Sequence, residues 1–444
     1  MLNKVKLNNL TLLFFYSIPI ITVIFFISLF GVDIPFWDEW ELVTLFDKIF
    51  SNTLSFQDLF IQHNEHRIII PKLIFIALIL INGWNTKQLM FISVLLVITS
   101  FIFCCKINYL VFNNENKKQH LINLLIGFLV FSLGQWENWL WGFQIAWFLI
   151  NLCFIISIYF LIKVNKENLY RYLFYSAFFC FIASFSSAHG LLIWLAVLPL
   201  ILGLKINVNS KIKIIIFWVS SFLICTSIYL IDYHKPSHHP NILFNAENAF
   251  TRIKYFFVLI GSFAPTIKSR AIIGFFSFII LIAFYFYCYL KGLTKVKKYY
   301  LLPLSFSLYS VLFALITTLG RAGFGVGQAT SSRYLTPMIW LYISLIYIGY
   351  FLLNKKSDLK NSYFKKITIA FCTVFCIIFI INSTVSIKYG YESYLSREKS
   401  KRCLNDINYP IESEINKQCL SYLYPDIEIM VQRNEKLKSL NIRK

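Results

Sequence analysis

Apolar runs separated by short polar intervals follow one another along the whole chain. About eleven of these runs approach the roughly 20 residues that a helix needs to cross a hydrocarbon core about 30 Å thick. Two further runs, 68–81 and 255–265, are too short to cross comfortably and are expected to be re-entrant or interfacial. The pattern predicts an all-α fold, a polytopic transmembrane helical bundle of about 11–13 spans. The expected spans are 10–30, 89–112, 121–133, 143–162, 173–186, 191–204, 214–231, 272–290, 301–319, 335–353 and 367–385.

The composition agrees with a membrane protein. The chain of 444 residues is 58% hydrophobic and only 14% charged, which excludes an ordinary soluble domain. Its net charge of +21 would suit nucleic acid, but the bases lie in short loops between apolar runs, where they act as topology signals. We therefore expect no nucleic-acid partner. The run 10–30 is longer than the apolar region of a signal peptide and no small-residue cleavage site follows it, so we expect a first transmembrane helix.

The distribution of bases predicts the topology. The N-terminus and five loops together hold twenty bases and three acids, and the positive-inside rule places them in the cytoplasm. The tail is then periplasmic, and only one of the runs 68–81 and 89–112 can cross. We expect a transmembrane domain over 1–386 and an extracytoplasmic tail over 387–444. The five basic loops are 106–118, 163–171, 205–213, 291–298 and 355–366.

The first polar interval, 31–71, is the most acidic part of the chain and holds seven of its twenty-one carboxylates. Asp38 and Glu39 are adjacent there, between two tryptophans that favour the membrane interface. Partial desolvation and mutual repulsion tune such a carboxylate toward general-base chemistry. We expect Asp38 and Glu39 to be catalytic and Glu41 to help to bind substrate. The alternative is a solvated acidic loop with an aromatic belt.

The end of the same interval, HNEHRIIIPK, places charges where the chain re-enters apolar surroundings. Charges at that depth are usually paired or functional. Glu65 or His66 is expected to share acceptor binding with Asp38, and Arg67 to clamp a phosphate through its planar guanidinium. Two histidines three residues apart on a helix can hold a metal, as can the histidines of the 232–240 loop, but no metal site or cofactor is expected.

A tryptophan-rich motif, GQWENWLWGFQ, surrounds a single carboxylate with indoles and carboxamides. Indole faces with polar partners at the rim are suited to holding a sugar ring. An aromatic belt is the alternative, although a belt requires no carboxylate. The expected sugar-binding residues are Gln135, Trp136, Glu137, Asn138 and Gln144.

A glycine-rich motif, GRAGFGVGQATSSRYLTP, carries Arg321, Arg333 and Tyr334 on the outer face. Cations on that face run against the positive-inside bias, and a lipid phosphate bound by arginine and backbone N–H groups explains them. The alternative is that both arginines extend to lipid headgroups.

Ten cysteines occur, and eight of them lie in or at the ends of apolar runs, where cysteine acts as a small hydrophobe. Cys403 and Cys419 lie in the polar tail and can pair there, a link worth about 3 kcal/mol by loop-closure arithmetic. Two free thiols are the alternative. No pair has zinc or haem spacing.

These motifs resemble the GT-C superfamily of polytopic glycosyltransferases, in which an acidic residue or pair in the first outer loop serves the reaction and the donor is a polyprenyl-phosphate sugar. The combination of PFWDEW, QHNEHRIIIPK, QWENWLWGFQ and GRAGFGVGQATSSRY with a two-cysteine tail is also similar to a set of bacterial membrane proteins, and the chain length suits the serotype-converting glucosyltransferases that decorate O-antigen. One departure is that GT-C topology makes the run after the first loop a true second span, whereas the charge count opposes this.

The resemblance implies an inner-membrane enzyme that moves one sugar from polyprenyl phosphate to a lipid-linked or surface polysaccharide. Asp38 would be the general base, with Glu39 orienting or replacing it, and Arg321 and Arg333 would hold the donor phosphate. An O-antigen polymerase and a lipid-linked saccharide transporter or flippase are the alternatives. A transporter should carry charges at mid-span, and here the central thirds of the runs are almost free of them.

Overall fold

The computed structural model describes residues 9–112, 116–237, 239–240, 246–291, 298–354, 362–405 and 414–442. These residues form a helical bundle and contain no β-strand. Eight helical segments among them are long and apolar enough to cross a membrane, so the expected polytopic helical bundle is confirmed. They lie in α1 (Asn9–Phe30), α5 (Thr86–Phe112), α6 (Asn116–Val130) with α7 (Trp136–Trp139), α8 (Ile145–Lys163), α12 (Val208–Leu230), α14 (Ile267–Leu290), α15 (Lys298–Arg321) and α16 (Leu335–Asn354).

Among the described residues, the helices that are both long and apolar enough to cross a membrane are fewer than the eleven to thirteen spans expected. The run 173–186 forms α9 (Leu169–Ser184), whose 16 residues extend only about 24 Å. The run 191–204 is broken at Val197 into α10 (Leu192–Ala196) and α11 (Leu198–Leu202), and Pro199 in the first turn of α11 has no N–H with which to continue the earlier helix. The run 367–385 lies inside α17 (Ser362–Asn405), and eight of its nineteen side chains fall outside the described residues.

The two short apolar runs form short helices, as their lengths predict. The first is α4 (Ile69–Asn82), whose 14 residues extend about 21 Å, less than the hydrocarbon thickness. The second run begins in α13 (Ala246–Ile260), and α13 packs against α14. The helix α4 is thus shorter than the second span that the resemblance to the GT-C superfamily implies.

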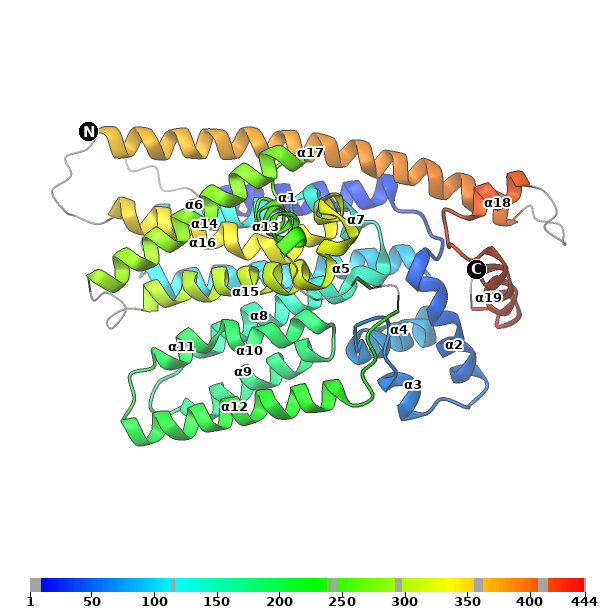
Figure 1. Cartoon of the computed structure of the whole chain (residues 1–444), viewed down its shortest axis with the longest axis horizontal. Helices are drawn as coiled ribbons and strands as arrows, with labels where there is room; N and C mark the ends of the chain where they lie inside the picture. The colour runs from blue at the N-terminus through cyan, green and yellow to red at the C-terminus, as the bar shows by residue number, and fades with distance from the viewer. Residues whose placement is uncertain are drawn as a thin grey trace.

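The loops of the bundle gather at two ends (Figure 1). One, here called the acidic end, holds the first loop with α2 (Leu42–Phe50), α3 (Phe56–Phe60) and α4, together with α18 (Glu414–Leu420) and α19 (Ile427–Ser439). The other, here called the basic end, holds the C-terminal ends of α5, α8, α11, α14 and α16. The separation matches the two sets of loops predicted from the bases.

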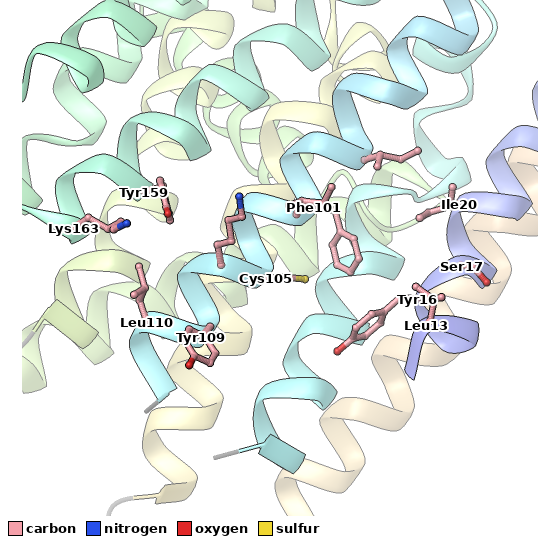
Figure 2. Close-up of a pocket in the computed structure, with 13 residues that line it drawn as sticks. Leu13, Tyr16, Ser17, Ile20, Phe101, Cys105, Tyr109, Leu110, Tyr159 and Lys163 are labelled. Carbon is pink, nitrogen blue, oxygen red and sulfur yellow. The ribbon is translucent and has the colours of Figure 1, made fainter. Parts of the chain in front are cut away.

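Three helices form one side of the basic end. There α5 packs against both α1 and α8, and Figure 2 shows the three helices with the side chains between them.

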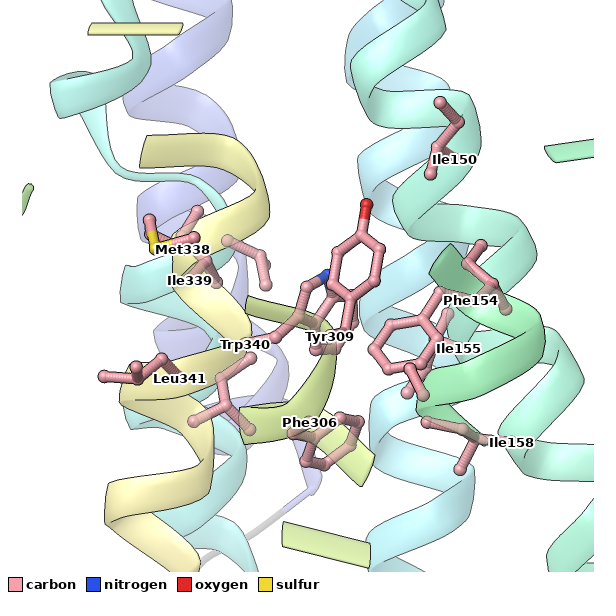
Figure 3. Close-up of a cluster of buried hydrophobic side chains, with 14 of the residues drawn as sticks. Ile150, Phe154, Ile155, Ile158, Phe306, Tyr309, Met338, Ile339, Trp340 and Leu341 are labelled. Carbon is pink, nitrogen blue, oxygen red and sulfur yellow. The ribbon is translucent and has the colours of Figure 1, made fainter. Parts of the chain in front are cut away.

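The centre of the bundle is an aromatic core formed by α8, α15 and α16 (Figure 3). The ring of Phe154 stacks on Tyr309 with centroids 4.7 Å apart, and the ring of Phe306 stacks on Trp340 at 5.2 Å. The Trp340 indole donates to Asn151 Oδ1 at 2.9 Å, and the Asn151 amide donates to the Thr336 carbonyl at 2.9 Å. Trp340, Asn151 and Thr336 thus pair within the protein, as a hydrocarbon environment favours, whereas the buried Tyr309 hydroxyl has no hydrogen-bond partner among the described residues.

The C-terminal tail is part of the acidic end. Its buried Leu423 and Met430 belong to one hydrophobic cluster with Trp40 and Phe46 of the first loop and Phe75 of α4. The proposed domain boundary at 386/387 falls inside the continuous helix α17.

Main-chain hydrogen bonds and a disulfide hold the tail in this position. The Trp37 N–H donates to the Leu423 carbonyl at 2.8 Å, and the Trp84 N–H donates to the Ile442 carbonyl at 2.6 Å. Cys403 and Cys419 form a disulfide. The tail therefore fixes the backbone beside Asp38.

Removing this disulfide is expected to destabilise the acidic end. The closed loop spans 16 residues, and its loss should cost about 3 kcal/mol. In thermal unfolding of detergent-purified protein, a variant with Cys403→Ser and Cys419→Ser should unfold at a lower temperature, and a reductant should lower the wild-type transition to the same value. Cys376→Ser, at an exposed free cysteine, is the control and should change neither. Equal transitions for the double variant and the wild type would contradict the structural role of the disulfide.

Candidate functional site

A cavity of about 680 Å³ opens at the acidic end. It is lined by side chains from the first loop, from the tryptophan-rich motif, from the turn before α10, from the loop after α12 and from the two ends of the glycine-rich motif. Its polar lining includes Asp38, His63, Glu65, His66, Gln144, His189, Lys235, Arg321 and Arg333. Its aromatic lining includes Trp37, Trp141, Phe143, Trp147, Tyr229, Tyr233, Phe313 and Tyr334.

Asp38 lies at the wall of the cavity and is paired with a histidine. Its Oδ2 is 3.6 Å from His63 Nε2, and the other ring nitrogen, Nδ1, is 3.1 Å from Glu41 Oε2. Burial alone would lower the pKa of His63, but the carboxylates of Asp38 and Glu41 outweigh it and raise that pKa to about 9. His63 is therefore an imidazolium at neutral pH, held between two carboxylates.

The backbone around Asp38 is fixed from both sides. Trp37 has φ 47°, a conformation that L-residues adopt only at a cost of about 1–2 kcal/mol. Its N–H is held by Leu423 of the tail. On the other side, His63 and His66 exchange two main-chain hydrogen bonds of 2.8 Å, which close a tight turn. The two histidines therefore lie on a turn and not on the helix that a two-histidine metal site would use.

Glu39 does not line the cavity, in contrast to the expectation that it is catalytic. It is 1% exposed, and its carboxylate accepts from the Phe36 N–H at 2.9 Å and from the Phe143 N–H at 3.0 Å. Burial raises the pKa of Glu39 to about 8, although Arg397 and the two N–H groups favour the ionised form. Glu39 thus joins the first loop to the tryptophan-rich motif. This is a positioning role, in line with the expectation that Glu39 orients Asp38 and not with the expectation that it replaces Asp38.

A second group of charges surrounds Glu65. Its carboxylate pairs with Arg321, and its Oε1 and Oε2 lie 3.6 Å from His66 Nε2 and 3.4 Å from His239 Nε2. Burial opposes ionisation of Glu65, but His66 and Arg321 outweigh it and lower the pKa to about 2. Burial also lowers the pKa of His66 to about 4. At neutral pH the group therefore contains an ionised Glu65 with Arg321 beside a neutral His66.

Arg333 is held by the tryptophan-rich motif. Its Nη1 is 3.8 Å from Glu137 Oε1, and the Ser331 and Ser332 hydroxyls donate to Glu137 Oε2 at 3.0 and 3.3 Å. Arg333 lines the cavity, whereas Glu137 lies behind it. Glu137 therefore orients Arg333 in this structure. From the sequence, Glu137 is expected to bind the sugar directly.

Three of the predicted binding residues lie away from the cavity and hold backbone. Arg67 is buried and donates to the carbonyls of Tyr229, Phe60 and Ile231. The Gln135 amide donates to Val130 and Ser132 carbonyls, and the Asn138 amide donates to the Arg333 carbonyl and to the Thr336 hydroxyl. In this structure Arg67 holds three carbonyls outside the cavity, so a phosphate bound in this cavity would not lie against its guanidinium.

Trp136, another predicted sugar-binding residue, does not line the cavity. Its ring stacks on that of Tyr389 of α17, with centroids 5.7 Å apart. Gln144 and Tyr334 line the cavity as expected, while Glu41 stands behind His63.

Sequence reasoning missed several lining residues that come from other helices. The ring of Trp147 of α8 lies against that of His189, tilted by 32° with centroids 4.6 Å apart, and Tyr233 and His239 come from the loop after α12. The histidines of the 232–240 loop are a sequence signal, but nothing in the local pattern indicates that His239 meets Glu65. Arg397 was also missed. It is buried, donates to the Leu140 carbonyl and lies 3.9 Å from the centre of the Phe36 ring.

No group of three or more His, Cys, Asp and Glu side chains in the described part of the chain has the arrangement of a metal site. His238, one of the histidines considered for such a site, lies outside the described residues.

Comparison with known proteins finds no matching protein family, no matching curated protein and no matching solved structure.

The charge on His63 predicts a pH-dependent contribution to stability. A group whose pKa is raised in the folded state stabilises fully below its unfolded pKa, about 6.5, and the contribution is lost as the pH rises through the folded value of about 9. The unfolding temperature of the wild type should therefore exceed that of His63→Gln at pH 6, and this difference should become smaller at pH 9.5. A difference that stays constant between these pH values would show that His63 carries no charge between Asp38 and Glu41.

The buried hydrogen bonds of Glu39 predict an asymmetric effect of an isosteric change. Glu39→Gln replaces one acceptor oxygen by an NH₂ group that faces a backbone N–H, so it should destabilise the protein by about 1–3 kcal/mol. The measurement is chemical or thermal unfolding of purified protein. Glu435→Gln, at an exposed position of α19 beyond its first turn, serves as the matched control and should be neutral. Equal stability of the two variants would mean that Glu39 does not tie the loops together.

Proposed function

We propose that the protein is an integral-membrane glycosyltransferase of the GT-C type, which moves one sugar from a polyprenyl-phosphate donor to a hydroxyl of a lipid-linked or surface polysaccharide. The proposed location is a bacterial inner membrane with the acidic end in the periplasm. The observation that carries the proposal is that a single cavity holds Asp38, Arg321 and Arg333, although almost three hundred positions separate the aspartate from the arginines.

The shape of the cavity supports a lipid-linked donor. Leu230 of α12 and Ile316 and Leu319 of α15 line it and remain 53%, 52% and 46% exposed. Exposed apolar side chains on membrane helices face lipid, so the cavity is open sideways to the bilayer beside Arg321. A polyprenyl chain lying there would bring its phosphate to the arginines.

The charges of the cavity support binding of an anion. Arg321 and Arg333 are each oriented by one carboxylate, and a guanidinium has five N–H donors, so donors remain for a phosphate. The described residues that line the cavity include Lys235 as a third permanent cation. Only two carboxylates, Asp38 and Glu65, are in the same lining set.

The aromatic walls support binding of a sugar. Trp37, Trp141 and Trp147 present indoles to the cavity, and an indole face packs on the apolar face of a sugar ring while polar neighbours meet the hydroxyls. Gln144 and Asn64 are amides in the same wall.

The reaction can be written with the residues of the chain. The acceptor hydroxyl gives its proton to the Asp38 carboxylate as its oxygen forms a bond to the anomeric carbon of the sugar. The bond from that carbon to the phosphate oxygen breaks, and the electron pair leaves with polyprenyl phosphate. Arg321 and Arg333 offset the charge on this leaving group, which needs no proton. Glu39, His63 and Leu423 hold Asp38 in place.

Asp38→Asn is expected to lower the rate of sugar transfer by about 10²- to 10⁴-fold, because the general base is removed. The measurement is transfer of labelled sugar from polyprenyl phosphate to polysaccharide in membranes. Asp47→Asn is the matched control, since Asp47 pairs with Lys436 outside the cavity and should leave the rate unchanged. Full transfer by Asp38→Asn would contradict the mechanism.

The glycans of a strain with and without the gene give a second readout of the proposed activity. If loss of the gene leaves full-length polysaccharide that lacks one branch sugar, the protein is a side-branch transferase. Single repeat units would instead indicate a polymerase, the alternative enzyme, and unchanged glycans would contradict both.

A further inference from the structure

A second cavity lies at the basic end, on the side of the bundle formed by α1, α5 and α8 (Figure 2). Its volume of about 730 Å³ is within the range of about 300–1,000 Å³ that small-molecule sites occupy. None of its described lining residues also lines the cavity at the acidic end. It is called the basic-end groove below.

The basic-end groove has the length and the walls that suit an acyl chain. It follows α5 from Ile98 to Leu110, a distance of about 18 Å at 1.5 Å per residue, close to the roughly 15 Å depth of one leaflet. Its walls are mostly apolar, with Leu13 of α1 67% exposed and Ile102 of α5 46% exposed. In a bilayer these surfaces contact lipid chains.

Two lysines line the groove toward the basic end. Lys106 lies near the C-terminal end of α5 and Lys163 is the last residue of α8. Their ammonium groups lie 5.0 Å from the Phe103 ring centre and 5.4 Å from the Tyr159 ring centre. Among the described residues neither lysine forms an ion pair with a carboxylate, in contrast to Arg321 and Arg333 at the acidic end.

We propose that the basic-end groove binds an anionic phospholipid, with the lipid phosphate between Lys106 and Lys163 and one acyl chain along α5. Basic pockets between membrane helices on the cytoplasmic side recognise anionic headgroups by charge, while the chain is held by apolar contact. A zwitterionic headgroup carries a compensating cation and gains less from two lysines. The assignment is independent of the proposed transfer reaction, because it concerns a different cavity.

Native mass spectrometry of the protein in detergent tests this assignment, with phosphatidylglycerol and phosphatidylcholine added at equal concentration. Each lysine near an anionic headgroup contributes about a fivefold preference, so the double variant Lys106→Gln and Lys163→Gln should retain at least about tenfold less phosphatidylglycerol than the wild type. Cys105→Trp, which fills the groove without a change in charge, should lower retention of both lipids.

Two controls keep the result specific. Lys205→Gln with Lys213→Gln removes the same charge from exposed positions outside the groove and should retain phosphatidylglycerol like the wild type. The double variant Lys106→Arg and Lys163→Arg keeps both charges and should retain phosphatidylglycerol like the wild type. This result would show that the Gln variant loses lipid through loss of charge and not through misfolding. Equal retention of the two lipids by the wild type, or wild-type retention by the Gln variant, would overturn the proposal.

Discussion

Unpaired polar groups and isolated charges are costly in a hydrocarbon core, and this cost governs where the polar residues of the protein lie. In the centre of the bundle Asn151 pairs with Trp340 and with the Thr336 backbone, and the Thr336 hydroxyl pairs with Asn138. Almost all charge is therefore displaced to the two ends. The consequence is that residues distant in the chain meet at the acidic end, because the first loop, the tryptophan-rich motif, the glycine-rich motif and the tail all lie there.

At the acidic end one buried carboxylate links the loops that form the cavity. Glu39 accepts from Phe36 of the first loop and from Phe143 of the tryptophan-rich motif, and Arg397 of α17 lies close enough to influence its charge. The tail adds the hydrogen bond from Trp37 to Leu423, next to Asp38. The candidate base is thus held by groups that do not touch the cavity, an arrangement that favours a rigid reactive geometry.

Much of this arrangement follows from sequence and part of it does not. Apolar run length and loop charge predict the helical bundle and its two ends, because both depend only on local composition. They fail for α9 and the broken pair α10 and α11, where runs of 14 residues were counted as spans. The motifs also indicate Asp38, Arg321 and Arg333, since charge at a membrane surface is a local signal. Asp38 faces the cavity and Glu39 does not, because Glu39 accepts from the Phe143 N–H about a hundred residues away. Arg67 likewise donates to carbonyls of distant segments. These hydrogen bonds join segments that are distant in the chain, so the local sequence does not predict them.

The most direct test of the account is a cryo-electron microscopy structure of the protein in lipid nanodiscs with a polyprenyl phosphate. The account predicts the phosphate in the acidic-end cavity, within hydrogen-bond distance of Arg321 or Arg333, with the Asp38 carboxylate facing the same space and the prenyl chain passing Ile316 and Leu319. A phosphate found only beside Lys106 and Lys163, or a cavity that stays without lipid at saturating polyprenyl phosphate, would contradict it.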